Sequence, residues 1–131
     1  MFIDASAIIA IITFEPDKLS LSQRLAGAKK TFISPIVLFE AALGLARKAN
    51  CRIDEANATL EKFIKNIDAE IVPIDAEIGQ AALRAHDIFG KGRHKASLNM
   101  GDCFAYACAK SRNIPLLYKG NDFIHTDILS A

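Results

Sequence analysis

The sequence predicts an α/β fold in which a parallel β-sheet is flanked by helices. Short apolar segments of strand length alternate with longer segments of helical length along the 131 residues. Hydrophobic residues make up 51% of the chain, which suits a dense core and argues against disorder. The length fits one domain, and there is no internal repeat, low-complexity tract or linker. We therefore expect residues 1–131 to form a single domain.

Five short segments are expected as strands and six longer ones as helices. The strands are short β-rich or apolar runs, at residues 1–3, 31–33, 70–74, 114–118 and 128–129. The helices have apolar residues at helical spacing or a clear start signal, at residues 5–12, 17–27, 35–48, 54–66, 76–89 and 99–111.

Capping residues and prolines fix several of these boundaries. Ser34 and Pro35 supply a cap followed by proline at the first helical position. Asp75 is placed to cap the helix that runs to Phe89. Pro73 lies near the end of the third strand, which suits a strand at the edge of the sheet.

Composition excludes several classes of protein. No apolar run reaches the ~18 residues that a membrane span needs, and no signal peptide is recognisable, so we expect a soluble, cytoplasmic protein with no membrane partner. Three cysteines without a C-x-x-C spacing argue against a disulfide framework or a zinc knuckle. The net charge of +1 gives no overall attraction to polyanions, so a nucleic-acid surface would have to be local.

Acidic side chains are expected at the carboxyl ends of the strands. Asp4 follows the first strand and Asp122 follows the fourth, at the sheet edge where open α/β proteins bind ligands. Glu40 lies in the second turn of a helix that begins at this edge, and it is the only charge in the run 36–46. Asp102 heads a nearly all-apolar helix. It reaches the same edge only if the start of that helix folds back over the sheet.

Each acid also has a purely structural interpretation. Asp4 could cap the following helix, and Glu40 could be a solvent-facing gap in a helix that is otherwise buried. No basic residue stands three or four positions from Glu40 to pair with it. Asp102 could complete a capping box with Asn99, and Asp122 could belong to an ordinary turn.

Carboxylates that gather at one edge must be neutralised. A pair ~4 Å apart costs about 4 kcal/mol at an effective dielectric near 20. Several such pairs would rival the whole stability of a domain, roughly 5–15 kcal/mol. The acids must therefore share protons or hold cations. A ligand set of oxygen atoms without His or Cys favours Mg²⁺ or Mn²⁺ over zinc, and such ions stabilise charge at a transferring phosphoryl group.

Five motifs, taken in this order and at these spacings, resemble one known family. They are Phe2-Ile3-Asp4-Ala5-Ser6, then Ser34-Pro35 followed by Glu40, then Gly92-Arg93-His94, then Leu98-Asn99-Met100-Gly101-Asp102-Cys103-Phe104-Ala105-Tyr106, and last Leu116-Leu117-Tyr118-Lys119-Gly120-Asn121-Asp122-Phe123. The chain resembles the PIN-domain ribonucleases over essentially its full length, and specifically the VapC-like toxins of toxin–antitoxin pairs.

This resemblance implies a three-layer sandwich with a central, parallel, five-stranded sheet whose first strand is central. By position, Asp4, Glu40 and Asp102 match the three acids that occur most regularly in the family, where they bind Mg²⁺ or Mn²⁺. Ser6 matches a small hydroxyl residue that orients the first aspartate. Family membership also implies a homodimer and a cognate antitoxin that blocks the acidic pocket.

The fourth acid of the family is less closely matched. Many members place it two residues earlier relative to the phenylalanine, where this chain has Gly120. Asp122 or Asn121 would then complete the site, or three acids would suffice.

Metal-assisted hydrolysis of an RNA phosphodiester is the expected function. Asp4 and Asp102 would hold the principal ion, with Glu40 acting through water or on a second ion. A polar loop would contact the RNA phosphates through four side chains, Lys91, Arg93, His94 and Lys95. On charge alone, a solvated loop without a role explains these residues equally well.

A non-catalytic α/β module is the alternative. A phospho-acceptor signalling domain usually has paired acids after the first strand and an acceptor aspartate after the third. Here one acid follows the first strand, and Asp75 after the third is in a helix-capping position. A phosphatase with an aspartyl nucleophile would have Asp-x-Asp where this chain has Asp4-Ala5-Ser6. A PIN fold that only binds partners is the remaining alternative.

Overall fold

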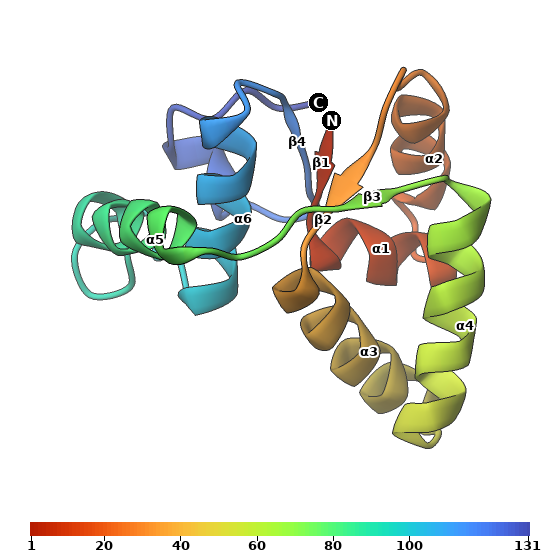
Figure 1. Cartoon of the computed structure of the whole chain (residues 1–131). Coiled ribbons are helices and arrows are strands. Elements are labelled where there is room, and N and C mark those ends of the chain that lie inside the picture. The colour runs from red at the N-terminus through yellow and green to blue at the C-terminus, as the bar shows by residue number, and fades with distance from the viewer.

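The computed structural model describes residues 1–131, and Figure 1 shows its strands at the centre with helices to either side. Strands and helices alternate as the sequence predicts. In chain order the elements are β1 (Phe2–Ile3), α1 (Ala5–Ile12), α2 (Lys18–Ala26), β2 (Phe32–Ile33), α3 (Pro35–Ala49), α4 (Ile53–Asn66), β3 (Glu70–Ile71), α5 (Ala76–Phe89), α6 (Met100–Ser111), β4 (Leu116–Leu117) and the 3₁₀ turn η1 (Phe123–His125).

The four strands form one parallel sheet in the order β3-β2-β1-β4. β1 is therefore interior, and its Phe2 lies beside Phe32 of β2 and Leu116 of β4. β3 is an edge strand, as Pro73 just beyond it indicated. The predicted fold class, a parallel sheet flanked by helices, is confirmed.

The prediction of five strands is wrong in the count, because the structure has four. The expected strand at 128–129 is replaced by a single parallel bridge between Leu116 and Ser130. Just before it, the side chain of Asp127 binds Tyr106 and Lys110 of α6. This attachment directs the segment toward α6, so only its last residues run beside β4.

Two groups of helices surround the sheet. α5 and α6 pack against each other on the left of Figure 1, and α1, α2, α3 and α4 form the group on the right. α6 also contacts β1 and β4 directly, which brings its first turn toward the sheet. None of the helices combines the length and the hydrophobicity that crossing a bilayer requires.

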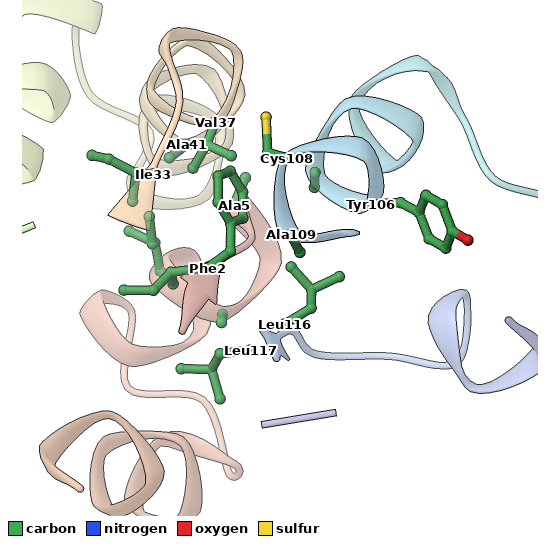
Figure 2. Packing of buried hydrophobic residues seen from close by; sticks show 14 of the residues in the cluster. Phe2, Ala5, Ile33, Val37, Ala41, Tyr106, Cys108, Ala109, Leu116 and Leu117 are labelled. Atoms are coloured by element: carbon green, nitrogen blue, oxygen red, sulfur yellow. The ribbon is translucent and has the colours of Figure 1, made fainter. Parts of the chain in front are cut away.

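The core is built around β1 from 32 buried hydrophobic residues. Phe2, Leu116 and Leu117 are fully buried, as expected for parallel strands with both faces covered. Figure 2 shows Tyr106 on the far side of α6 from Phe2, with its hydroxyl pointing away from the core. That hydroxyl donates to Asp127 at 2.6 Å, so Tyr106 combines core packing with attachment of the C-terminal segment.

The three cysteines are free thiols. Cys103 and Cys108 are buried in α6, and Cys51 is half-buried after α3. Burial is the main cause that raises the pKa of Cys103 and of Cys108 to about 11, so both thiols are neutral at pH 7. Their role in the fold is packing.

Side-chain caps determine where the helices near the sheet edge begin. Asp4 caps α1 and accepts a hydrogen bond from Ser6 N at 2.9 Å. Ser34 caps α3, with its Oγ accepting from Val37 N at 3.3 Å and proline in the first turn. α1 and α3 therefore start at the carboxyl ends of β1 and β2, where the candidate acids lie.

Candidate metal centre

Asp4 is a buried carboxylate at the carboxyl end of β1. The residue is only 4% exposed, and its N–H donates to Leu117 O of β4 at 2.9 Å. Burial raises the pKa of Asp4, two hydrogen bonds from Ser6 lower it, and the charge of Asp122 raises it. Asp4 caps α1, as the structural interpretation predicted. The capping hydrogen bonds do not offset the effect of burial, because the pKa of Asp4 stays raised.

Ser6 connects Asp4 to the end of β4. The Ser6 Oγ donates to Asp4 Oδ2 at 2.5 Å and accepts from Lys119 N at 3.0 Å. The hydroxyl thus has one partner after β1 and one after β4, and these two contacts hold the Asp4 carboxylate in its orientation. The orienting role that the resemblance implied for Ser6 stays a prediction, and this hydrogen bond is the contact that it requires.

Glu40 projects from α3 toward the start of α6. A Cβ atom at Gly101 would collide with both carboxylate oxygens of Glu40, so the carboxylate lies directly against the main chain at 101. Burial is the main cause that raises the pKa of Glu40, and the charge of Asp4 adds to it. Glu40 is therefore half-buried beside another acid, which excludes a purely solvent-facing role.

Asp102 is in the first turn of α6, where it caps the helix and also lies among the other acids. It forms a capping box with Asn99: Asp102 N donates to Asn99 Oδ1 at 2.9 Å, and Asn99 N donates to Asp102 Oδ2 at 2.8 Å. Burial is the main cause that raises the pKa of Asp102 to about 7, against the lowering effect of the Asn99 hydrogen bond. The charges of Asp4, Asp122 and Glu40 raise it further.

The start of α6 folds back toward the sheet, because the main chain at Gly101 touches the Glu40 carboxylate of α3 and α6 contacts both β1 and β4. The capping box and the grouping with other acids are both present, so the two interpretations of Asp102 are compatible.

Asp122 and Asn121 are in the turn between β4 and η1. Both are exposed, and Gly120 before them has a φ of 102°, which lets the chain turn tightly there. After burial, the charge of Asp122 is a lesser cause that raises the pKa of both Asp4 and Asp102, and the turn follows Lys119, whose N–H binds Ser6. No structural contact favours Asn121.

No basic side chain neutralises these four carboxylates. Seven ion pairs join charged residues of the chain, and none includes Asp4, Glu40, Asp102 or Asp122. The donor set is oxygen alone, and burial raises the pKa of Asp4, Glu40 and Asp102, which fits a hard divalent cation such as Mg²⁺ or Mn²⁺. No three of the chain's His, Cys, Asp and Glu side chains converge to a common metal-ligand distance. The fit therefore rests on charge and donor chemistry.

The basic loop between α5 and α6 is closed at its base by a bridge between residues 90 and 98. Within it, Arg93 donates to Asp87 at 2.8 Å, and His94 Nδ1 accepts a hydrogen bond from the main chain of the loop. Lys91 and Lys95 are exposed and form no ion pair.

Two features of the site were not recognised from the sequence. Gly101 leaves the space that the Glu40 carboxylate occupies. The sequence offered one hint of this, a glycine in the first turn of a helix, where glycine costs about 1 kcal/mol relative to alanine. Lys119 donates its N–H to Ser6, but a main-chain contact between residues 113 positions apart leaves no trace in the sequence.

A family model described as PIN domain matches residues 1–129. The chain belongs to the PIN-domain family. The resemblance drawn from the five sequence motifs is thereby confirmed, and the phospho-acceptor and phosphatase alternatives are set aside.

Curated relatives match along the whole chain. A VapC ribonuclease of Rhizobium meliloti is 43% identical over 139 residues, and the match covers 97% of this chain and 98% of the relative. Ribonuclease VapC30 of Mycobacterium tuberculosis is 35% identical over 131 residues, covering 100% of this chain and 98% of the relative.

Solved structures share the fold at low sequence identity. VapC20 of Mycobacterium tuberculosis, described as a sarcin-ricin loop cleaving toxin, superposes with a TM-score of 0.79 at 16% identity, over 99% of this chain and 97% of that one. A toxin–antitoxin complex from Klebsiella pneumoniae gives a TM-score of 0.73 at 17% identity, over 99% and 95% of the two chains. At these identities the likeness establishes the fold alone.

Proposed function

We propose that this chain, as a single PIN domain over residues 1–131, is a divalent-metal-dependent endoribonuclease and the toxin of a toxin–antitoxin pair. The observation that carries the proposal is that Asp4, Glu40 and Asp102 are carboxylates withdrawn from solvent, take part in none of the ion pairs, and have pKa values that burial raises. The ribonuclease names of relatives at 35% and 43% identity support the same activity.

The residues divide the work of holding an ion. Asp4 and Asp102 would hold the principal Mg²⁺ or Mn²⁺, and Glu40 would act through water or on a second ion. Ser6 holds the Asp4 carboxylate in place, and Asp122 is favoured over Asn121 as the fourth group because its charge acts on Asp4 and Asp102. When bound, the ion supplies stabilisation of the negative charge that develops on the phosphoryl group.

The reaction is hydrolysis of an internal phosphodiester. A water oxygen bonds to phosphorus and the water gives up one proton, the bond from phosphorus to the 3′ oxygen breaks, and that oxygen takes up a proton. Lys91 and Lys95 would hold neighbouring phosphates, since neither is engaged in an ion pair. Arg93 keeps further N–H donors beside the one that binds Asp87, and His94 keeps its Nε2, so both would add to this contact.

Cleavage of a labelled RNA with Mg²⁺, with Mn²⁺ and with EDTA tests the proposal. We expect cleavage with either ion, none with EDTA, and a loss of at least about 100-fold in Asp4→Asn and Asp102→Asn. Glu61→Gln on α4 is the matched control, because it removes an exposed acid whose charge does not shift the pKa of Asp4, Glu40 or Asp102, and it should cleave at the wild-type rate.

A PIN fold that only binds partners is the second candidate. It predicts that the wild-type chain binds RNA but cleaves none with either ion. Cleavage that survives both Asp4→Asn and Asp102→Asn would instead indicate a contaminating nuclease and would contradict the proposed site.

Partners follow from the same proposal. A cognate antitoxin would cover the acidic pocket, and the Klebsiella pneumoniae neighbour, a toxin–antitoxin complex, supports a partner of this kind. We also propose a homodimer and action in the cytoplasm, where RNA substrates are found. Light scattering should give twice the chain mass of 14.2 kDa. Co-expression with the product of an adjacent small reading frame should suppress RNA cleavage.

A further inference from the structure

Glu15 joins three parts of the fold just outside the acidic cluster. It follows α1, and its side chain is only 17% exposed. Its Oε1 pairs with Lys48 near the end of α3, and its Oε2 pairs with Lys119 directly after β4. One carboxylate therefore connects the end of α1, the end of α3 and the end of β4.

Lys119 has both its charge and its main chain engaged. The ammonium group pairs with Glu15 and lies 3.4 Å from Asp17 Oδ2. Its N–H donates to Ser6 Oγ at 3.0 Å, and that same hydroxyl donates to Asp4 Oδ2 at 2.5 Å. A continuous chain of contacts thus runs from Glu15 through Lys119 and Ser6 to the first acid of the site.

The position of residue 119 also determines where the fourth acid lies. Asp122 is three residues further along, beyond the tight turn at Gly120. A shift of the main chain at Lys119 would therefore move the partner of Ser6 and the turn that carries Asp122 together.

We propose that Glu15 and Lys119 are positioning residues for the acidic cluster, an inference that rests on the proposed function. Their ion pair holds the main chain after β4 in place, so that Ser6 orients Asp4 and Asp122 stays at the sheet edge. Lys119 is not a phosphate contact in this arrangement, because two carboxylates already occupy its ammonium group.

Affinity for Mn²⁺, measured by calorimetry and by electron paramagnetic resonance without RNA, tests the inference directly. We expect Lys119→Met and Glu15→Gln each to weaken Mn²⁺ binding about tenfold, the usual effect of removing a group that orients a metal ligand. Lys119→Arg keeps the charge and should restore most of the affinity. Lys110→Met is the matched control, because it breaks the separate ion pair with Asp127 and should leave Mn²⁺ affinity unchanged.

RNA kinetics distinguish positioning from substrate contact. A positioning role predicts that kcat falls about tenfold in Lys119→Met while KM changes less than about twofold. A rise in KM alone, with unchanged Mn²⁺ affinity, would mean that Lys119 contacts phosphate and would overturn the inference. If Lys119→Met fails to fold, wild-type Mn²⁺ affinity in Glu15→Gln overturns it equally.

The two proposals fail in different ways. A wild-type chain that binds Mn²⁺ but cleaves no RNA contradicts the proposed function, while the Mn²⁺ measurements still decide the positioning role. A wild-type chain that cleaves RNA, with Glu15→Gln and Lys119→Met as active as wild type, contradicts the positioning role alone. Absence of Mn²⁺ binding by the wild-type chain contradicts both.

Discussion

At the scale of single residues, the site depends on small groups as much as on its acids. Ser6 holds Asp4 from one side and the end of β4 from the other. Gly101 leaves the space that the Glu40 carboxylate fills. These two positions carry no charge that could bind an ion, yet each determines where a carboxylate lies.

Ser6→Ala is expected to weaken Mn²⁺ binding about tenfold, because Asp4 loses the hydroxyl that orients it. The fold should lose about 1 kcal/mol of stability with the two hydrogen bonds. Calorimetry with Mn²⁺ and thermal unfolding measure the two effects. Ser6→Thr keeps the hydroxyl and serves as the control. Equal Mn²⁺ affinity in Ser6→Ala and wild type would remove Ser6 from the site.

Gly101→Ala is expected to reduce RNA cleavage at least about tenfold with little loss of stability. The new methyl group must displace the Glu40 carboxylate, which is the flexible end of its side chain, while alanine favours the helix by about 1 kcal/mol. Gly79→Ala in α5 is the matched control, since a Cβ there meets no atom within 4 Å. Its cleavage rate should equal that of wild type. Full activity in Gly101→Ala would show that the place of Glu40 is unimportant.

At the scale of elements, helix starts bring the acids to the sheet edge. Asp4 caps α1, Ser34 begins α3 with Glu40 in its second turn, and the capping box of α6 includes Asp102. Asp4 and Asp102 each help to cap the start of a helix, and each also belongs to the group of acids. Local stability and site geometry are therefore linked at these two positions.

Asn99→Ala and Asp75→Ala separate these two roles of a cap. Each removes a side-chain cap, of α6 and α5 respectively, and each should lower stability by about 1 kcal/mol in thermal or urea unfolding. Only Asn99→Ala should also reduce RNA cleavage, because it frees the start of α6 that carries Asp102. Equal loss of activity in the two variants would mean that stability alone explains the effect.

At the scale of the whole molecule, burying several acids at one edge destabilises the metal-free fold at neutral pH. The pKa values of Asp4, Glu40 and Asp102 are all raised by folding. The folded state then binds protons more tightly than the unfolded chain. The contribution of these three acids to stability is fully present below their unfolded pKa near ~4. It is lost as the pH rises through their folded pKa values, up to about 7 for Asp102. Asp54 and Asp127, whose pKa values are lowered, act only at more acidic pH.

The melting temperature in EDTA should therefore fall by about 5 °C between pH 5.5 and pH 8. Mn²⁺ at pH 8 should restore it, because ligand binding to the folded state stabilises that state. Asp102→Asn should show a smaller decrease with pH than wild type. A melting temperature that rises over this interval would contradict the electrostatic grouping of the acids.

Most of the fold could be predicted from the sequence because its signals are local. Ser34 and Pro35 announce the start of α3, and Asp75 that of α5, through hydrogen bonds within one helical turn. The prediction of a fifth strand was wrong because the path of the chain beside β4 depends on the hydrogen bond between Asp127 and Tyr106. These residues are 21 positions apart, so no local pattern reveals their contact.

The sequence by itself determined the order of elements, the family and the acids at the ends of the strands, since each follows from short-range pattern. Only the tertiary structure decided that the start of α6 lies beside the sheet, that Gly101 touches the Glu40 carboxylate, and that the Lys119 N–H binds Ser6. Those relations join α6, α3 and the end of β4 across the core. Electrostatic and steric contacts of this kind depend on distance in space, which the order of residues does not contain.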